Sequence, residues 1–328
     1  MVEKGMIVVT GGAGFIGSVL VWQLNTAGIE DIVIVDELGD TDKWKNIAKR
    51  RFADYLHKDA FLTSVREGRV RFPVRAIVHM GACSATTERD ADFLMENNYR
   101  YSRILAEWAV AQEIRFVYAS SAATYGDGAR GFSDDDAVTR TLLPINAYGF
   151  SKQVFDLWVL RQGWEGKVAG IKFFNVFGPQ EYHKGDMRSV VHKAYQQIRD
   201  AGSVRLFKSY REPYPDGGQL RDFVYVKDCV EVMWWLLENR DANGLFNVGT
   251  GKARTWNDLM QATFAAMNLP VQIEYIDMPP GLEEQYQYFT EAQMEKLPAA
   301  GCPVTFRPLE DAVRDYVTGH LQQPDPYL

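Results

Sequence analysis

The chain has 328 residues, a formal net charge of −7 and 46% hydrophobic residues, which fits an ordinary globular protein of one or two domains. The acidic balance offers no basic face for nucleic acid, so a phosphate-bearing ligand must be held locally by glycine loops or single Lys and Arg side chains. Its three scattered cysteines lack metal-ligand spacing, so no metal is expected and the thiols are expected to be reduced in a cytoplasmic protein. The first apolar run is too short for a membrane span and lacks a signal-peptide cleavage pattern, so no membrane partner is expected.

A glycine-rich turn follows the first apolar run, in the sequence IVVTGGAGFIGS at residues 7–18. This pattern predicts a strand, a turn and a helix that cradle a dinucleotide. Gly11 turns off the strand, Gly14 lets a pyrophosphate approach the backbone, and Gly17 lets the helix pack closely on the sheet. A second apolar run ends in Asp36, where a carboxylate can accept a hydrogen bond from a ribose hydroxyl. No Gly-Lys-Ser/Thr sequence follows the glycines, which disfavours a phosphate loop of the ATPase kind.

A polar and basic stretch, Glu37 to Ala53, follows Asp36 and is expected to be a loop. Its Lys43 is either a cation that meets a ribose 2′-phosphate or a solvated lysine. After the next strand, the small-residue turn Met80 to Ser84 lies at a carboxyl edge where a cofactor is expected. Cys83 in that turn is expected to be a packing residue rather than a nucleophile.

Apolar runs along the rest of the chain alternate with helical patterns. This alternation predicts an α/β fold with a Rossmann-type, doubly wound parallel sheet, in which the carboxyl ends of the strands face one crevice. The strands of this sheet are expected at 32–35, 76–79, 116–119, 168–173, 221–226 and 246–251. The other expected elements are a helix that opens at Asn97 and Asn98, a helix at 255–267, a short strand at 273–276 and a helix at 309–316.

The sequence YGFSK places Tyr148 and Lys152 one turn apart if it lies on a helix. A phenol with a pKa near 10 is a poor base at neutral pH, and lowering that pKa by about three units requires roughly 4 kcal/mol. A neighbouring ammonium and the positive ring of a nicotinamide could supply that energy. Ser121 ends the preceding strand at the same crevice, so these three residues are candidate catalytic groups. The alternative for the spacing alone is a helix with one exposed Tyr and one exposed Lys.

The regular alternation fades after residue 173, where the chain is expected to leave the sheet and build a smaller α/β lobe over the substrate. Lys184 lies in this transition, and the Pro- and Gly-rich stretch Tyr210 to Gln219 is expected to be a long loop over the crevice. The expected division is an NAD(P)-binding domain of residues 1–174 plus about 222–251, and a substrate lobe of residues 175–221 plus about 252–328.

Together these motifs resemble the extended short-chain dehydrogenase/reductases, the family of nucleotide-sugar epimerases and dehydratases. The glycine pattern, the Ser/Tyr/Lys set, the Asn175 segment and the sequence RDFV all match. Within that family the most similar members are those that act on ADP-heptoses, by the sequences MGACSATTE, SSAATYG, FNVFGPQEYHKG and QYQYFT at residues 80–88, 120–126, 174–185 and 285–290. The resemblance implies epimerisation at C6 of ADP-D-glycero-D-manno-heptose through a 6-keto intermediate, with tightly bound NADP, or else NAD, for lipopolysaccharide core synthesis.

The resemblance also assigns residues to roles. The catalytic positions are Ser121, Tyr148, Lys152 and Lys184, the last being a second acid/base that is unusual in the wider family. The cofactor positions are Gly11, Gly14, Phe15, Ile16, Gly17, Asp36, Glu37, Lys43, Lys58, Met80, Gly81, Ala82, Cys83, Ser84, Asn97, Tyr148, Lys152, Val176 and Lys184. The substrate positions are Ser84, Ser121, Asn175, Asp186, Lys193, Phe207, Lys208, Ser209, Arg221 and Tyr286.

Four features depart from the family pattern. Glu37 stands in place of an amide, Asp186 in place of a non-acidic residue and Lys193 in place of a histidine, and the loop before Arg221 is longer. Asp36 and Glu37 together disfavour NADP relative to NAD, because two carboxylates repel a 2′-phosphate.

Three other functions are alternatives to C6 epimerisation. A 4,6-dehydratase carries Asp-Glu where this chain has Ala122 and Ala123, which largely excludes it. A UDP-hexose 4-epimerase stays open, because its strand motif is close to SSAATYG. A non-catalytic dinucleotide-sensing module has no need for Tyr148 and Lys152 together. The resemblance further implies a homo-oligomer and is compatible with a homopentamer.

Overall fold

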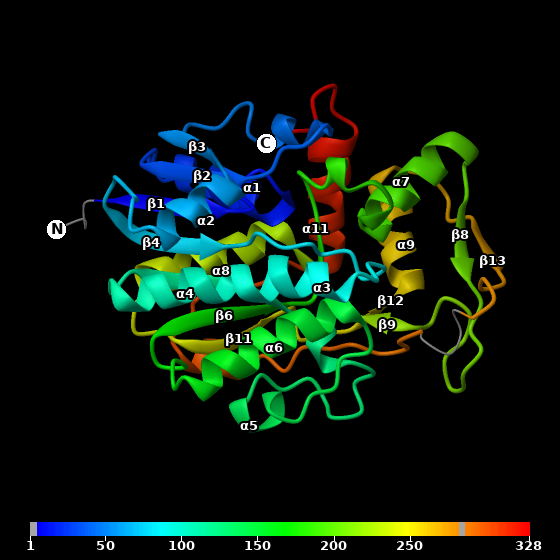
Figure 1. Cartoon of the computed structure of the whole chain (residues 1–328). Helices are drawn as coiled ribbons and strands as arrows, with labels where there is room; N and C mark the ends of the chain where they lie inside the picture. The colour runs from blue at the N-terminus through cyan, green and yellow to red at the C-terminus, as the bar shows by residue number, and fades with distance from the viewer. Residues whose placement is uncertain (1–4, 282–285) are drawn as a thin grey trace.

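The computed structural model describes residues 5–281 and 286–328, and its centre is a parallel sheet of seven strands in the order β11-β6-β5-β4-β1-β2-β3 (Figure 1). Neighbouring strands all pair in parallel, and the strand order reverses between β1 and β4, which is where open α/β sheets bind ligands. The strands of this sheet are β1 (Met6–Thr10), β2 (Ile32–Asp36), β3 (Asp54–His57), β4 (Val74–His79), β5 (Arg115–Ser121), β6 (Val168–Phe173) and β11 (Gly244–Val248).

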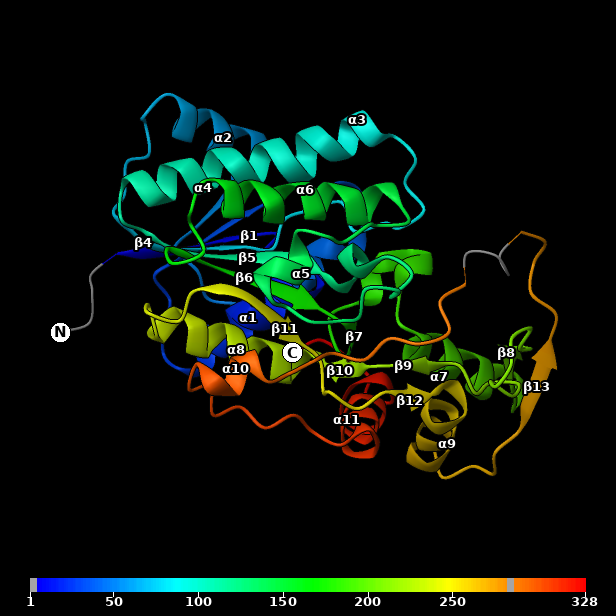
Figure 2. The same ribbon diagram turned by 90° about the horizontal axis from the view of Figure 1, so that it is seen from below.

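Helices cover both faces of the sheet, so its inner strands are buried and almost continuously apolar. In Figure 2, α1 and α8 lie below the sheet and α2, α4 and α6 above it, and a separate hydrophobic cluster fills each side. These helices are α1 (Phe15–Thr26), α2 (Lys58–Arg66), α4 (Tyr101–Ala111), α6 (Ala147–Arg161) and α8 (Val226–Glu238). Among the described residues, no helix is long and apolar enough to span a bilayer.

A second group of elements lies beyond the carboxyl ends of the strands (Figure 1). It contains α7 (Val190–Ala201), α9 (Trp256–Ala266) and α11 (Leu309–Tyr316), with the strand pairs β8 (Val204–Phe207) and β13 (Ile273–Ile276), β9 (Leu220–Arg221) and β12 (Arg254–Thr255), and β7 (Asn175–Phe177) and β10 (Phe223–Tyr225). The short elements are α3 (Ala91–Leu94), α5 (Asp136–Thr139), α10 (Lys296–Ala299), the 3-10 turns η1 (Asp42–Asn46), η3 (Ala122–Tyr125) and η4 (Tyr182–Met187), and the π-helical turns η2 (Met95–Arg100) and η6 (Val317–Leu321).

The predicted α/β class and parallel sheet are confirmed, as are the helix after Thr255, the strand at 273–276 and the last helix. The helix after Thr255 begins there because Thr255 and Asp258 form a reciprocal capping box. Gln285, the first residue of the QYQYFT sequence, lies outside the described residues.

Two elements went unpredicted, and two expectations about elements were wrong. Strand β3 and helix α2 went unpredicted because β3 is a half-exposed edge strand without an apolar run. The helix placed at Asn97 and Asn98 already begins at Ala91, where Asp90 caps it, and both asparagines lie inside the π-helical turn η2. The stretch 221–226 does not return to the main sheet, because β10 pairs with β7.

Candidate active site

A cleft of about 870 Å³ opens at the carboxyl ends of the sheet strands. The turn after β1, the ends of β2, β4 and β5, helix α6 and the η4 segment all line it. Every residue predicted to be catalytic or to bind the cofactor lines this cleft. The fold therefore brings together side chains that are up to 173 positions apart in the sequence, from Gly11 to Lys184.

The glycine turn forms the floor of one end of the cleft. Gly11 has a φ of +66°, and a Cβ there would lie 2.7 Å from the Gly81 nitrogen. A Cβ on Gly17 would lie 2.2 Å from the Gly11 carbonyl oxygen, so only glycine lets α1 start this close to β1. No side chain caps α1 at Gly14 and no acidic residue lies in its first turn, so its first N–H groups are available to an anion. This cradle fits the pyrophosphate of a dinucleotide.

The Asp36 carboxylate at the end of β2 is held by its own chain. It accepts hydrogen bonds from the backbone N–H groups of Ala13, at 2.8 Å, and Glu37, at 2.7 Å. It also pairs with the Lys43 ammonium at 2.5 Å. The sequence left two roles open for Lys43, a cation that meets a 2′-phosphate or a solvated lysine. The structure pairs it with Asp36 in the lining of the cleft.

Glu37 is balanced by a second lysine. The Lys58 ammonium lies 2.9 Å from its carboxylate, and this hydrogen bond lowers the pKa of Glu37. Lys58 also donates to the side-chain oxygen of Asn97 at 3.1 Å. The two carboxylates that sequence considerations set against a 2′-phosphate are therefore each neutralised by a lysine.

Tyr148 and Lys152 lie on helix α6 as predicted, one turn apart. The helix begins here because the Asn146 side chain accepts from the Gly149 N–H at 2.7 Å. Tyr148 shares a hydrogen bond with Ser121, and the Lys152 ammonium donates to the Ala119 carbonyl at 2.8 Å. A hydroxyl, a phenol and an ammonium thus meet at the end of β5.

Burial dominates the ionisation of both α6 residues. It raises the pKa of Tyr148, and the hydrogen bond with Ser121 opposes that rise only partly. It lowers the pKa of Lys152 to about 8, against the attraction of Asp156. Lys152 loses its proton at a lower pH than Tyr148, so its charge does not lower the Tyr148 pKa in the protein alone. In the protein alone the phenol is therefore protonated at neutral pH, as an acid must be, and the lowering expected from Lys152 is not seen.

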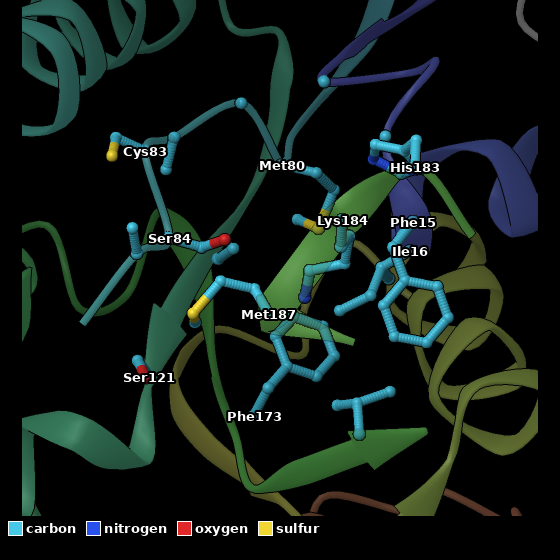
Figure 3. A pocket seen from close by; sticks show the side chains of 18 of the residues that line it. Phe15, Ile16, Met80, Cys83, Ser84, Ser121, Phe173, His183, Lys184 and Met187 are labelled. Carbon is cyan, nitrogen blue, oxygen red and sulfur yellow. The ribbon is translucent and has the colours of Figure 1, made fainter. Parts of the chain in front are cut away.

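Lys184 reaches the cleft from the η4 segment. Its ammonium lies 5.3 Å from the centre of the Phe15 ring, and Figure 3 shows its side chain among Phe15, Ile16, Met80 and Met187. Burial in these surroundings lowers the pKa of Lys184. A lysine in such a place gives up its proton more readily than a solvated lysine, which suits an acid/base group.

The comparisons with known proteins agree with this geometry. The model of the NAD dependent epimerase/dehydratase family matches residues 7–249. The chain belongs to this family. An ADP-L-glycero-D-manno-heptose-6-epimerase of Nitratidesulfovibrio vulgaris is 62% identical over 98% of this chain and all of its own length. The enzyme of that name from Fusobacterium nucleatum is 49% identical over 98% of this chain and all of its own length.

Solved structures show the same architecture. The Helicobacter pylori ADP-L-glycero-D-manno-heptose-6-epimerase has a TM-score of 0.78 and 26% identity, over 97% of this chain and 96% of its own. A Thermus thermophilus UDP-glucose 4-epimerase in complex with NAD has a TM-score of 0.74 and 25% identity, over 95% and 98%. The family is described as NAD dependent, and the glycine cradle is the part of the cleft whose backbone suits a dinucleotide.

The residues predicted to bind substrate fall into two groups. Ser84, Ser121 and Asn175 line the cleft. The others do not line it, and these are Asp186, Lys193, Phe207, Lys208, Ser209, Arg221 and Tyr286. Lys208 is instead paired with Asp277 at 3.0 Å. Arg221 is 8% exposed and lies between the rings of Trp256 and Tyr286, 5.6 and 5.4 Å from their centres.

Several residues of the cleft were not predicted. His183, Met187 and Arg188 line it from the same segment as Lys184. Their nearness to Lys184 in the sequence indicates that they share its side of the cleft. Trp256 lines it from the start of α9, where the local sequence predicts only a helix. Within residues 5–281 and 286–328, no group of three or more His, Cys, Asp or Glu side chains is placed to hold a metal ion.

Proposed function

We propose that this protein epimerises ADP-D-glycero-D-manno-heptose at C6 to ADP-L-glycero-D-manno-heptose, a step of lipopolysaccharide core synthesis. Relatives that carry this activity in their names are 44–62% identical over nearly the whole chain. The observation that carries the proposal is the presence of two separate acid/base candidates in one cleft, Tyr148 on α6 and Lys184 on η4.

Inversion at C6 sets the chemistry that the site must support. C6 bears an ordinary secondary hydroxyl without a neighbouring carbonyl, so its hydrogen is not acidic enough for direct removal as a proton. A nicotinamide dinucleotide held by the glycine cradle would supply the means of taking up and returning a hydride. A transient 6-ketone must then turn its opposite face, and its oxygen moves to a new place.

The protein's own side chains handle the proton at the two positions of that oxygen. We assign Tyr148 to one orientation, with Ser121 donating a hydrogen bond to the sugar oxygen. Lys152, while it is protonated, stabilises the phenolate that Tyr148 becomes when it gives up its proton in the reaction. We assign Lys184 to the other orientation, because it enters from a different element. Glu181 holds the η4 segment in place, since its buried carboxylate accepts from the Ser189 hydroxyl at 2.6 Å and from the Tyr316 hydroxyl at 2.9 Å.

A direct assay tests the proposal. Purified protein with bound cofactor is expected to interconvert the two C6 epimers of ADP-glycero-manno-heptose and to leave UDP-galactose unchanged. Turnover of UDP-galactose alone would favour the 4-epimerase. Absence of turnover on both sugars, with cofactor bound, would favour the non-catalytic sensing module.

The cofactor is proposed to be NADP rather than NAD. Lys43 and Lys58 neutralise Asp36 and Glu37 and stand where they can turn to a 2′-phosphate. We expect apo-protein to bind NADP more tightly than NAD in a calorimetric titration. Lys43→Met is expected to weaken NADP binding about tenfold, or about 1.4 kcal/mol, and to leave NAD binding within about twofold.

The matched control is Lys45→Met. Lys45 lies in the same η1 turn and pairs with Asp42, but it does not line the cleft. Tighter binding of NAD by the unaltered protein would overturn the NADP assignment and leave the dinucleotide site as it is.

The remaining proposals concern assembly and organisation. We propose a homo-oligomer, with a pentamer as the form to test, and light scattering at micromolar concentration measures its mass. A monomer mass would contradict this proposal. We retain the proposed division into a dinucleotide-binding domain and a substrate lobe, and a cytoplasmic location for the protein.

A further inference from the structure

One face of helix α6 continues below the proposed catalytic pair. Tyr148, Lys152 and Asp156 follow one another at intervals of four residues, so their side chains lie on the same side of the helix. Lys152 donates to the Ala119 carbonyl at 2.8 Å, and Asp156 accepts from the Ser120 hydroxyl at 2.6 Å. Successive residues of β5 thus bind successive turns of α6.

Asp156 is a fully buried carboxylate with no role in the proposed chemistry. Its carboxylate pairs with the Lys172 ammonium of β6 at 3.0 Å and accepts from the Tyr118 hydroxyl at 3.1 Å. Lys172 is also fully buried and donates to Thr124 at 2.8 Å. Replacing a buried ion pair by apolar residues of similar volume often costs nothing, so stability alone is a weak reason for a pair at this place.

The Asp156–Lys172 pair supplies the charges that pack directly against this face of α6. Several titratable groups pack around this face of α6. They are Tyr148 and Asp156 on the helix, Tyr118 on β5, Tyr125 on η3, Asp136 on α5, Lys172 on β6, His79 on β4 and Cys83 after β4. Burial raises the pKa of Tyr118 and lowers that of His79 to about 3, so both are neutral near pH 7. Asp156 is the carboxylate on this face of α6 itself, and Lys172 is its direct partner.

We propose that Asp156, held by Lys172 and Ser120, is a positioning residue that fixes the end of β5 against helix α6 and so keeps Lys152 in place beside Tyr148. This inference rests on the proposed function, because Lys152 matters for turnover only if Tyr148 is the acid/base. Asp156 contacts neither the cleft nor any reacting atom and acts through Lys152.

The proposal predicts the direction in which the pKa of Lys152 changes when Asp156 is replaced. Burial lowers the pKa of Lys152 to about 8, and Asp156 counters that effect. Removing the Asp156 charge therefore lowers this pKa further, toward neutral pH. Because an ammonium exists only below its pKa, the support that Lys152 gives to Tyr148 is then lost at lower pH than in the wild type.

The pKa of Lys152 can be measured directly by NMR of protein labelled at the lysine ε-carbons, with Lys152→Met identifying the signal. Asp156→Asn is expected to lower this pKa by about one unit, a tenfold change in the ionisation constant. Asp156→Asn leaves the buried Lys172 ammonium without its carboxylate partner and can impair folding. The second variant, Asp156→Asn with Lys172→Met, removes both charges. It is expected to shift the Lys152 pKa in the same direction by a smaller amount, because Lys172 repels the Lys152 ammonium whereas Asp156 attracts it.

The matched control is Asp228→Asn. Asp228 is also a buried helical carboxylate paired with a cation, Arg307, but it lies on α8 and away from the cleft. This variant is expected to leave the Lys152 pKa unchanged. An unchanged Lys152 pKa in a folded Asp156 variant would overturn the proposal.

Epimerase assays complete the test. Asp156→Asn is expected to show kcat about fivefold lower at pH 8, an unchanged KM, and an alkaline limb of the kcat profile displaced by the same amount as the Lys152 pKa. An unchanged kcat profile despite a displaced pKa would also overturn the proposal. A wild-type protein inactive on ADP-heptose would contradict the proposed function instead, and the NMR titration would still decide whether Asp156 controls Lys152.

Discussion

Replacing Tyr148 by phenylalanine is expected to lower epimerase turnover by about three orders of magnitude, near the upper range for loss of a positioned acid/base. The change removes one hydroxyl from a helix that is otherwise unaltered. The phenol shares a hydrogen bond with Ser121 and is protonated at neutral pH in the protein alone. Its loss therefore leaves the sugar oxygen without a proton partner in one of the two orientations. Steady-state kinetics with ADP-heptose measure the effect.

The comparison for this variant is Tyr99→Phe. Tyr99 lies in the η2 turn and does not line the cleft, so its hydroxyl can be removed without touching the site. Tyr148→Phe is expected to bind cofactor and unfold like the wild type, because the lost hydroxyl supports neither the cradle nor the core. Turnover within tenfold of the wild type would remove Tyr148 from the mechanism.

Lys184→Met is expected to lower turnover by at least about two orders of magnitude, because inversion needs a proton partner at each position of the oxygen. Burial lowers the pKa of Lys184. The pH above which this lysine is an effective base is therefore lower than for a solvated lysine. Methionine keeps the length and the apolar contacts of the stem with Phe15 and its neighbours (Figure 3). The loss should therefore appear in kcat rather than in folding.

Lys167→Met is the control for this variant, since Lys167 is exposed before β6 at the opposite end of the sheet. If Lys184→Met turned over at near the wild-type rate while Tyr148→Phe did not, the mechanism with two acid/base groups would be wrong. A loss of cofactor affinity with little change in kcat would instead make Lys184 a contact to the phosphate or the nicotinamide.

Local sequence determined the parts of the site that depend on short spacings. The glycines at 11, 14 and 17 predict the cradle because a Cβ at each would approach backbone atoms nearby in the sequence or the sheet. A Cβ on Gly17, for example, would collide with the Gly11 carbonyl oxygen. Tyr148 and Lys152 could be paired because helical geometry fixes positions four residues apart. The sheet followed from apolar runs that alternate with helical patterns, since a strand buried on both faces must be apolar throughout.

The tertiary structure alone decided the features that join distant segments. The edge strand β3 has no apolar run, so its place beside β2 follows only from the sheet. The pairing of β10 with β7 depends on where the chain leaves the main sheet.

The charge balance of the site was also decided by the fold. From the sequence alone, Asp36 and Glu37 are two carboxylates that would repel a 2′-phosphate. In the fold, each carboxylate has a lysine partner. Asp156 and Lys172, sixteen residues apart on α6 and β6, carried no signal as a pair. Helix propensity and hydrophobic period act over a few residues, but a charge in a dry interior depends on whatever the fold places within a few ångströms of it.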